Sequence, residues 1–209
     1  MAPYFDQGLS KAQFKSLGFY ELGLIYFVAQ KKTDSIEALK GLKIWSWEGD
    51  ELVNSMISEM GLVSVPLPLP DVLSSLSTGV IEAAYAPPIG IVALQWNTKI
   101  KYLVDFPLAY SVGAFLLSNK AWASIPAAQQ KVVSDIAMKY TQEANTATIK
   151  DNEDALSAIK SLGVQYLKFP DGDVKKGLEY RQKVVKKLTG KLFSAQALSA
   201  LDKAMKENP

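Results

Sequence analysis

The sequence predicts an α/β fold with a mixed, mostly parallel sheet, a long helix and further C-terminal helices. Three observations predict it. Between residues 14 and 125, short apolar runs alternate with short amphipathic segments, which is typical of a parallel α/β sheet. Residues 127–162 contain neither glycine nor proline and repeat apolar side chains at helical spacing. Residues 173–207 hold two more amphipathic segments.

The expected strands are apolar runs rich in aromatic and β-branched residues. Residues 16–30 predict two short strands that are interrupted at residues 21–23. Residues 109–119 are apolar almost throughout, which fits a strand buried on both faces. The other expected strands are residues 42–47, 62–67, 80–86, 100–106 and 164–169.

The expected helices have recognisable boundaries. Ser35, Asp50 and Asp71 are typical N-cap residues, and a glycine follows the last turn of each helix that they begin. A single helix over residues 127–162 would be about 54 Å long, and the rising polarity at residues 150–154 marks a place for a break. The remaining expected helices are residues 87–96, 173–189 and 194–207.

The composition excludes several classes of protein. A net charge of +2 on 209 residues argues against a nucleic-acid-binding surface. The chain has no cysteine and no histidine, which excludes disulfides, thiolate nucleophiles, zinc sites built on these residues and Ser-His-Asp triads. No glycine-rich phosphate loop is present. We therefore expect no enzymatic activity, no cofactor and no metal ion.

Two features bear on the compartment. No apolar run reaches the roughly 20 residues that span a bilayer, and residues 1–14 lack the pattern of a signal peptide. A cysteine-free chain suits either the cytoplasm or the periplasm.

Arg181 is the only arginine, so bidentate recognition of carboxylates is almost unavailable to this chain.

The stretch "GLKIWSWEGDELVN" places two tryptophans at the end of an expected strand. Trp45 and Trp47 are two residues apart, so a strand would project both rings from one face. Ligands bind at this end of the strands in open α/β sheets. Two interpretations stay open: core aromatics, or the wall of a ligand cleft. Asp50 is read as a helix cap and Glu48 as solvated, rather than as an acid–base pair.

Three stretches carry a family resemblance. "EALKGLKIW", "SVPLPLPDVLSSLSTGVIEA" and "GAFLLSNKAWASIPAAQQKVV" occur in an order and spacing that resembles the solute receptors of TRAP transporters, the DctP-like extracytoplasmic binding proteins. The similarity covers about residues 14–169. It implies a periplasmic-binding-protein-like (type II) fold, a periplasmic location, a small-molecule solute held in an interlobe cleft, and TRAP membrane permease subunits as partners.

The resemblance also implies a division of the chain. Family members begin earlier, so this chain is expected to lack their N-terminal part. Residues 1–105 would form the second-lobe unit with the cleft wall, and residues 106–125 the crossover strands of the first lobe. Residues 126–162 would be the long helix, and residues 163–209 a strand with the C-terminal helices. The surface left by the missing lobe would favour a homo-oligomer.

The expected binding site departs from the family pattern. The arginine that grips the ligand's carboxylate in the family falls on Trp45, and a second one falls near Ile25. Indoles offer apolar area and one N–H donor but do not neutralise a carboxylate. The resemblance therefore implies an apolar, aromatic or cationic solute rather than a dicarboxylate. A cationic solute would be held by cation–π contact and by Glu48 or Glu82. The expected ligand-binding residues are Ile25, Trp45, Trp47, Glu48, Leu69, Tyr85, Trp96 and Tyr110.

Two other functions remain open. A shortened receptor that binds no solute would act as an oligomerising structural module. A small enzyme ranks third, because the chain lacks histidine, cysteine and a convincing acid–base pair.

Overall fold

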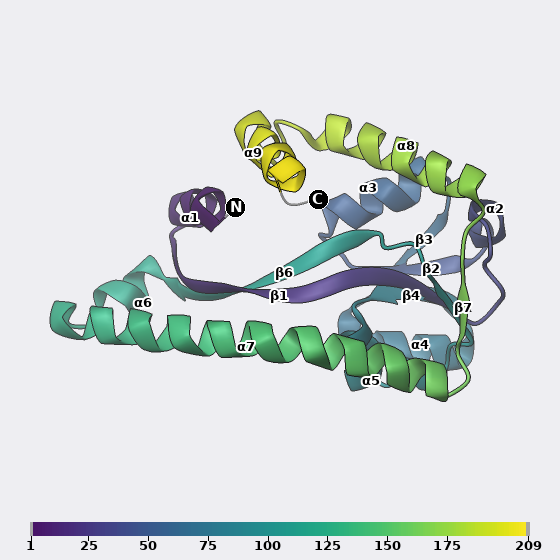
Figure 1. Cartoon of the computed structure of the whole chain (residues 1–209), viewed down its shortest axis with the longest axis horizontal. Helices are drawn as coiled ribbons and strands as arrows, with labels where there is room; N and C mark the ends of the chain where they lie inside the picture. Colours follow the sequence, from purple (N-terminus) through teal and green to yellow (C-terminus); the bar gives the residue numbers. More distant parts are fainter. Residues whose placement is uncertain (1, 208–209) are drawn as a thin grey trace. The chain divides into compact units, whose positions relative to one another are not determined.

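The computed structural model describes residues 2–207, and seven strands within them form one mixed sheet (Figure 1). The strands are β1 (Phe14–Ala29), β2 (Lys43–Ser46), β3 (Val63–Pro66), β4 (Ala83–Ala86), β5 (Tyr102–Val104), β6 (Ala109–Ser118) and β7 (Gln165–Leu167). Their order is β3-β2-β4-β1-β5-β7, and β6 pairs with β1. β2 runs parallel to β3 and β4, and β5 runs parallel to β7. β1 is antiparallel to both β4 and β5. The predicted α/β class is confirmed.

Helices connect and follow these strands. They are α1 (Ala2–Lys11), α2 (Ile36–Leu39), α3 (Glu51–Glu59), α4 (Val72–Thr78), α5 (Pro88–Ala93), α6 (Asn119–Ala123), α7 (Ala127–Ser161), α8 (Asp171–Leu188) and α9 (Ala195–Glu207). Two short 3-10 helices, η1 (Leu69–Asp71) and η2 (Trp96–Thr98), lie between them. No helix in residues 2–207, α7 included, combines the length and apolar character that crossing a bilayer requires.

The chain divides into two compact units. Among the described residues, unit 1 contains residues 2–23, 111–151 and 193–207, and unit 2 contains residues 24–110 and 152–192. β1, β6 and α7 each run from one unit into the other. These units reflect contacts within the chain, whereas the expected lobe boundaries reflect a family resemblance, so the lobe assignment stays a prediction.

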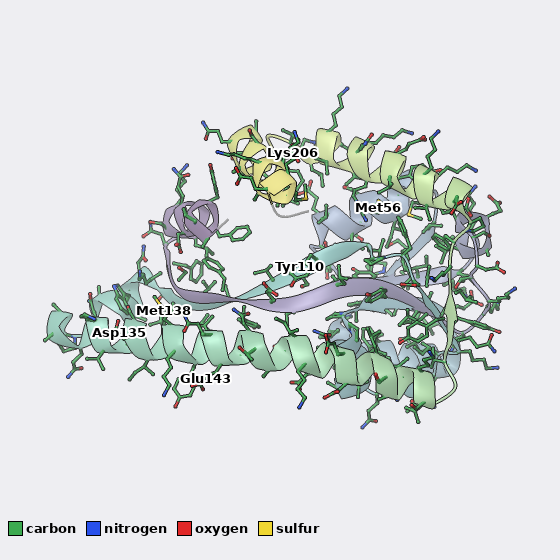
Figure 2. All side chains as sticks on the ribbon, viewed as in Figure 1. Met56, Tyr110, Asp135, Met138, Glu143 and Lys206 are labelled. Carbon is green, nitrogen blue, oxygen red and sulfur yellow. The ribbon has the colours of Figure 1, made fainter. Side chains whose placement is uncertain are left out.

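Unit 2 has helices on both faces of its strands. α3 and α8 cover one face, and α4 and α5 cover the other (Figure 1). Met56 on α3 points toward α8, and its side chain is buried (Figure 2). The side chains at the centre of this unit are almost completely inaccessible: Phe27, Val28, Ile44, Ile57, Leu76, Ile91, Leu103 and Ile159. This apolar core holds the carboxyl ends of the central strands in place.

Unit 1 exposes much more apolar surface. α7 holds β1 through Asn145, whose Oδ1 accepts from the Glu21 backbone N–H at 2.7 Å. Tyr20 of β1 packs on Phe115 of β6 with ring centroids 5.0 Å apart. The exposed large apolar residues of this unit are Tyr4, Phe5, Phe14, Val112, Phe115, Leu116, Val132, Ile136, Met138, Tyr140, Ile149, Leu201 and Met205. Unit 1 thus presents an apolar surface over several elements.

Local sequence signals place several boundaries correctly. The Ser35 Oγ accepts from the Ala38 N–H at 3.1 Å, and the Asp50 Oδ1 accepts from the Val53 N–H at 3.0 Å. Both are the predicted N-caps. Asp71 does not cap α4 with its side chain, because it ends η1 and already has helical backbone angles. α4 begins after Asp71 and ends before Gly79 as predicted, but the expected capping hydrogen bond from the Asp71 side chain is not formed.

Three further expectations about elements need correction. β1 runs unbroken from Phe14 to Ala29 where two short strands were expected, and Gly23 within it adopts a φ of 100°, which glycine tolerates. β6 contains no fully buried residue, although its apolar composition predicted burial on both faces. α7 is unbroken at residues 150–154, because Ala155 and Ile159 are buried and Asn152 accepts from the Ile89 N–H at 3.1 Å.

Candidate functional site

Trp45 is the centre of a group of aromatic rings in unit 2. Its ring centroid lies 4.9 Å from that of Tyr85, with planes 29° apart, and 5.4 Å from that of Trp96, edge to face. The indole is only 2% exposed, and its Nε1–H donates to the Leu67 carbonyl at 2.9 Å. Both arrangements are favourable ring geometries. The Trp45 N–H is already bonded within the protein and is not available to a ligand.

Trp47 is the accessible ring of this group. It lies one residue beyond the end of β2, its centroid is 6.2 Å from that of Trp45, and 49% of its surface is exposed. Its backbone is fixed on both sides. The Trp47 N–H donates to the Tyr85 hydroxyl at 3.2 Å, and the Trp47 carbonyl accepts from Asn54 Nδ2 at 3.1 Å. The backbone of Trp47 is therefore held by two hydrogen bonds, while its indole stays accessible to solvent. We call Trp45, Trp47, Tyr85 and Trp96 the aromatic cluster.

Tyr85 connects the aromatic cluster to a carboxylate. Its hydroxyl donates to Asp50 Oδ2 at 3.4 Å, while Asp50 also caps α3. Burial of the phenol raises the pKa of Tyr85 far above its ordinary value, and the negative charge of Asp50 raises it further. The phenol therefore stays neutral at physiological pH. Sequence reasoning assigned Asp50 only a capping role, because its approach to Tyr85 joins residues 35 positions apart.

The other expected site residues lie outside the ring contacts. Glu48 is exposed in the turn after Trp47, and Leu69 is half-buried at the start of η1. Ile25 is half-buried in β1, and its carbonyl accepts from the Leu108 N–H at 2.8 Å. Tyr110 lies in β6 and is 52% exposed (Figure 2). Their role in binding remains a prediction.

The aromatic cluster lies where parallel strands end. Since β4 and β5 are both antiparallel to β1, the strands β2, β3, β4, β5 and β7 all end at the same edge of the sheet. We call this the carboxyl edge, and the opposite one the amino edge. Ligands bind at the carboxyl edge in open α/β sheets. Trp47, Glu48 and Asp50 follow β2 at this edge.

Glu82 is at the other edge. It precedes β4, and its carboxylate pairs with Lys31 Nζ at 2.5 Å and accepts from the Lys43 N–H at 3.3 Å. These interactions, first of all the hydrogen bond from Lys31, hold the pKa of Glu82 below its ordinary value. The sequence-based suggestion that Glu82 could hold a cationic ligand beside Trp45 is therefore wrong.

Arg181 makes contacts within the protein. It belongs to α8, on the face of the sheet opposite α5 (Figure 1). Its Nη2 donates to the Pro107 carbonyl at 2.9 Å, and its guanidinium lies 5.8 Å from the centre of the Phe106 ring. No three acidic side chains in residues 2–207 come together in a way that could hold a metal ion.

Comparison with known proteins identifies the family. The sequence profile of DctP, described as bacterial extracellular solute-binding protein, family 7, matches residues 3–192. The chain belongs to the DctP family. This is a family of solute-binding proteins and not of enzymes, which agrees with the resemblance read from the sequence.

Individual DctP relatives are distant in sequence. The C4-dicarboxylate-binding periplasmic protein DctP of Rhodobacter capsulatus is 23% identical over 158 residues, which are 74% of this chain and 47% of that protein. A solute-binding protein of Verminephrobacter eiseniae is 22% identical over 152 residues, which are 72% of this chain and 45% of that protein. The chain thus spans less than half the length of the curated relatives that it matches.

Solved structures share the fold. DctP7, a Bordetella pertussis extracytoplasmic solute receptor binding pyroglutamic acid, superimposes with a TM-score of 0.86 at 20% identity, covering 96% of this chain and 66% of that one. A TRAP periplasmic solute-binding protein from Citrobacter koseri with bound D-glucuronate gives a TM-score of 0.81 at 22% identity, covering 100% of this chain and 67% of that one. The type II solute-binding fold expected from the sequence is confirmed.

Proposed function

We propose that this chain is a solute-binding receptor of a TRAP-type transporter that captures a small molecule in the periplasm and delivers it to a membrane permease. The observation that carries the proposal is the aromatic cluster at the carboxyl edge of a DctP-family fold. Ring surfaces bury ligand area, and the fixed backbone of Trp47 keeps its indole in place. This function consists of binding and releasing the solute and requires no covalent chemistry.

The solute is proposed to differ from a dicarboxylate. Trp45 occupies the position where the family resemblance expects a carboxylate-gripping arginine, and its N–H is bonded to Leu67. A carboxylate placed against these rings would lose hydration without gaining a guanidinium partner. Ile25, Glu48, Leu69 and Tyr110 are proposed to complete the binding surface around the aromatic cluster.

Titration with a panel of solutes tests the receptor function. The panel contains succinate, malate, D-glucuronate, pyroglutamate, an uncharged aromatic such as benzyl alcohol, and a quaternary ammonium such as choline. Calorimetry on the full chain should show saturable binding of at least one solute, weakened by Trp47→Ala. Tight binding of succinate or malate that Trp45→Ala and Trp47→Ala leave unchanged would exclude the proposed site. Absence of binding across the panel would contradict the receptor function.

Delivery to a permease needs a test in cells. Deletion of the gene should abolish uptake of the solute identified in the panel, and expression of the chain should restore it. Uptake that continues unchanged without the gene would contradict the transport role while leaving solute binding intact.

Self-association is a further part of the proposal. The exposed apolar residues of unit 1, including Val132, Ile136 and Tyr140 on α7, form a surface of the kind that drives association. We propose that two copies of the chain pair through this surface in solution.

A further inference from the structure

We infer that the site takes a cationic solute, a quaternary ammonium or protonated amine, held against Trp47 with the carboxylate of Asp50 as its countercharge. This inference rests on the proposed receptor function and names the charge class of its solute. Two independent observations carry it: the geometry of the aromatic cluster, and the way in which charges are distributed between the two edges of the sheet.

Trp47 is the ring of the aromatic cluster that remains open to a ligand. The Trp45 N–H and the Tyr85 hydroxyl are both used in hydrogen bonds within the protein. What stays accessible is the indole of Trp47, which is 49% exposed. A cation within about 6 Å of an indole centroid is attracted by the negative face of the ring, whereas a carboxylate is repelled by it. The exposed ring therefore favours positive charge.

A carboxylate lies in the same turn as this ring. The Asp50 N–H donates to the Trp47 carbonyl at 3.1 Å, and the Tyr85 hydroxyl contacts both residues. Asp50 is half-buried, so its charge is less screened by solvent than that of a fully exposed side chain. The protein already satisfies part of this carboxylate through Val53 and Tyr85. A cation stacked on Trp47 would supply the opposite charge.

Near this site, acidic residues lie at the carboxyl edge of the sheet and lysines at the amino edge. Residues 44–98, which supply all the connections at the carboxyl ends of β2, β3 and β4, contain no lysine and no arginine. Their acidic residues at the carboxyl edge are Glu48, Asp50, Glu51 and Asp71. Lysines lie at the amino edge instead, where Lys43 begins β2 and Lys31 pairs with Glu82. This side of the carboxyl edge is therefore negative and attracts cations.

Positive groups at the carboxyl edge belong to the other side of the sheet. Arg181 contacts the segment after β5, and Lys168 follows β7. In the strand order β3-β2-β4-β1-β5-β7, these strands are separated from β4 by β1. Arg181 also lies on the α8 face, whereas Trp45 contacts Trp96 directly after α5, on the opposite face. Arg181 is the one arginine of the sequence, so the test uses it to examine the competing outcome, which is binding of an acidic solute.

The test is built on one matched pair of ligands that differ mainly in charge. Choline and its neutral carbon analogue 3,3-dimethylbutan-1-ol have nearly the same shape, and tetramethylammonium, benzyltrimethylammonium and D-glucuronate extend the series. Calorimetry on the full chain should show a cation binding about tenfold or more tightly than its neutral analogue. Raising the salt concentration should weaken binding of the cation and leave that of the neutral analogue unchanged.

Two variants connect this preference to the named residues. Asp50→Asn keeps an N-cap residue for α3 but removes the charge, so the fold should persist while the cation preference falls about tenfold. Trp47→Ala should remove most cation binding, and Trp47→Phe should retain part of it. Thermal unfolding of each variant shows whether a loss of binding reflects loss of the fold.

The outcomes separate this inference from the receptor function. Preferential binding of D-glucuronate that Arg181→Gln abolishes would overturn the cation inference and leave the receptor function standing. Equal affinity for choline and its neutral analogue would overturn it too. Failure of every cationic, neutral and anionic probe to bind the folded chain would contradict the receptor function itself.

Discussion

The phenol ring of Tyr85 stacks on the indole of Trp45, with centroids 4.9 Å apart, and its hydroxyl reaches Asp50 at the start of α3. One side chain on β4 thereby joins the buried ring of β2 to the turn that presents Trp47. The stability of the fold and the shape of the proposed binding surface are coupled through this residue.

Trp45 and Trp47 should respond differently to truncation. Trp45→Ala removes a fully buried ring and should lower the free energy of unfolding by about 3–5 kcal/mol. Trp47→Ala removes a half-exposed ring and should cost less than about 1 kcal/mol. Urea denaturation followed by circular dichroism measures both. Equal losses would mean that Trp47 is part of the core and would argue against its role in binding.

Removal of the Tyr85 hydroxyl should have a modest effect at neutral pH. Tyr85→Phe loses the hydrogen bonds to Asp50 and Trp47, at a cost of about 1 kcal/mol. The ring stacking on Trp45 survives, so the variant should keep the fold. The same urea denaturation at pH 7 measures this difference, and a cost above about 3 kcal/mol would show that the hydroxyl has a larger structural role.

Tyr85 should also make stability depend on alkaline pH. Its pKa is raised in the folded state, so the folded protein keeps a proton that the unfolded chain loses above its ordinary value of 10.0. This contribution to stability is complete below pH 10 and is lost as pH rises toward the folded-state pKa. Burial raises the pKa of Tyr26 and Tyr166 as well, so Tyr85→Phe should reduce the slope without abolishing it. Denaturation between pH 8 and pH 11 measures the slopes, and identical slopes in both proteins would contradict this assignment.

Two glycines of α8 form a matched pair for a packing test. A Cβ added at Gly177 would lie 2.7 Å from Cζ of Phe106, a buried ring stacked on Phe169. Gly177→Ala should therefore cost about 1–3 kcal/mol through overpacking. A Cβ at Gly172 meets no atom within 4 Å, so Gly172→Ala should be neutral or stabilising by up to about 1 kcal/mol. Thermal unfolding of both variants compares them, and equal effects would show that α8 shifts freely to make room.

Self-association should depend on the exposed apolar residues of α7. Ile136 and Tyr140 are 51% and 59% exposed and lie one helical turn apart. The double variant Ile136→Lys/Tyr140→Lys should convert a dimer to a monomer near 22.9 kDa in sedimentation experiments. Gln142→Lys, an exposed polar position on the same helix, serves as the control and should leave the dimer intact. A monomer at all concentrations of the unmodified chain would contradict the proposed pairing.

Local sequence signals were enough for most helix boundaries and for the family. Ser35 and Asp50 cap their helices because each side chain reaches a backbone N–H three residues ahead, which needs no distant partner. The absence of glycine and proline over residues 127–161 predicted α7, since helix formation there depends on neighbours within one turn. The order of three short motifs was sufficient for the DctP family, which the profile match over residues 3–192 confirms.

Sequence spacing alone could not decide which tryptophan belongs to the core. Alternation along a strand gives Trp45 and Trp47 the same side, but β2 ends at Ser46, so Trp47 leaves the sheet and stays open. Trp45 becomes buried because Tyr85 and Trp96 arrive from β4 and η2.

The sequence by itself thus determined the helix caps at Ser35 and Asp50, the uninterrupted helical segment and the family. The tertiary structure decided which apolar residues are covered: Trp45 is buried, whereas β6 has no fully buried residue. It also decided that Asp50, and not Glu82, contacts the aromatic cluster. The physical reason is one of range. Caps and helices depend on atoms a few residues apart, whereas burial and electrostatic environment depend on segments that only the folded chain brings together.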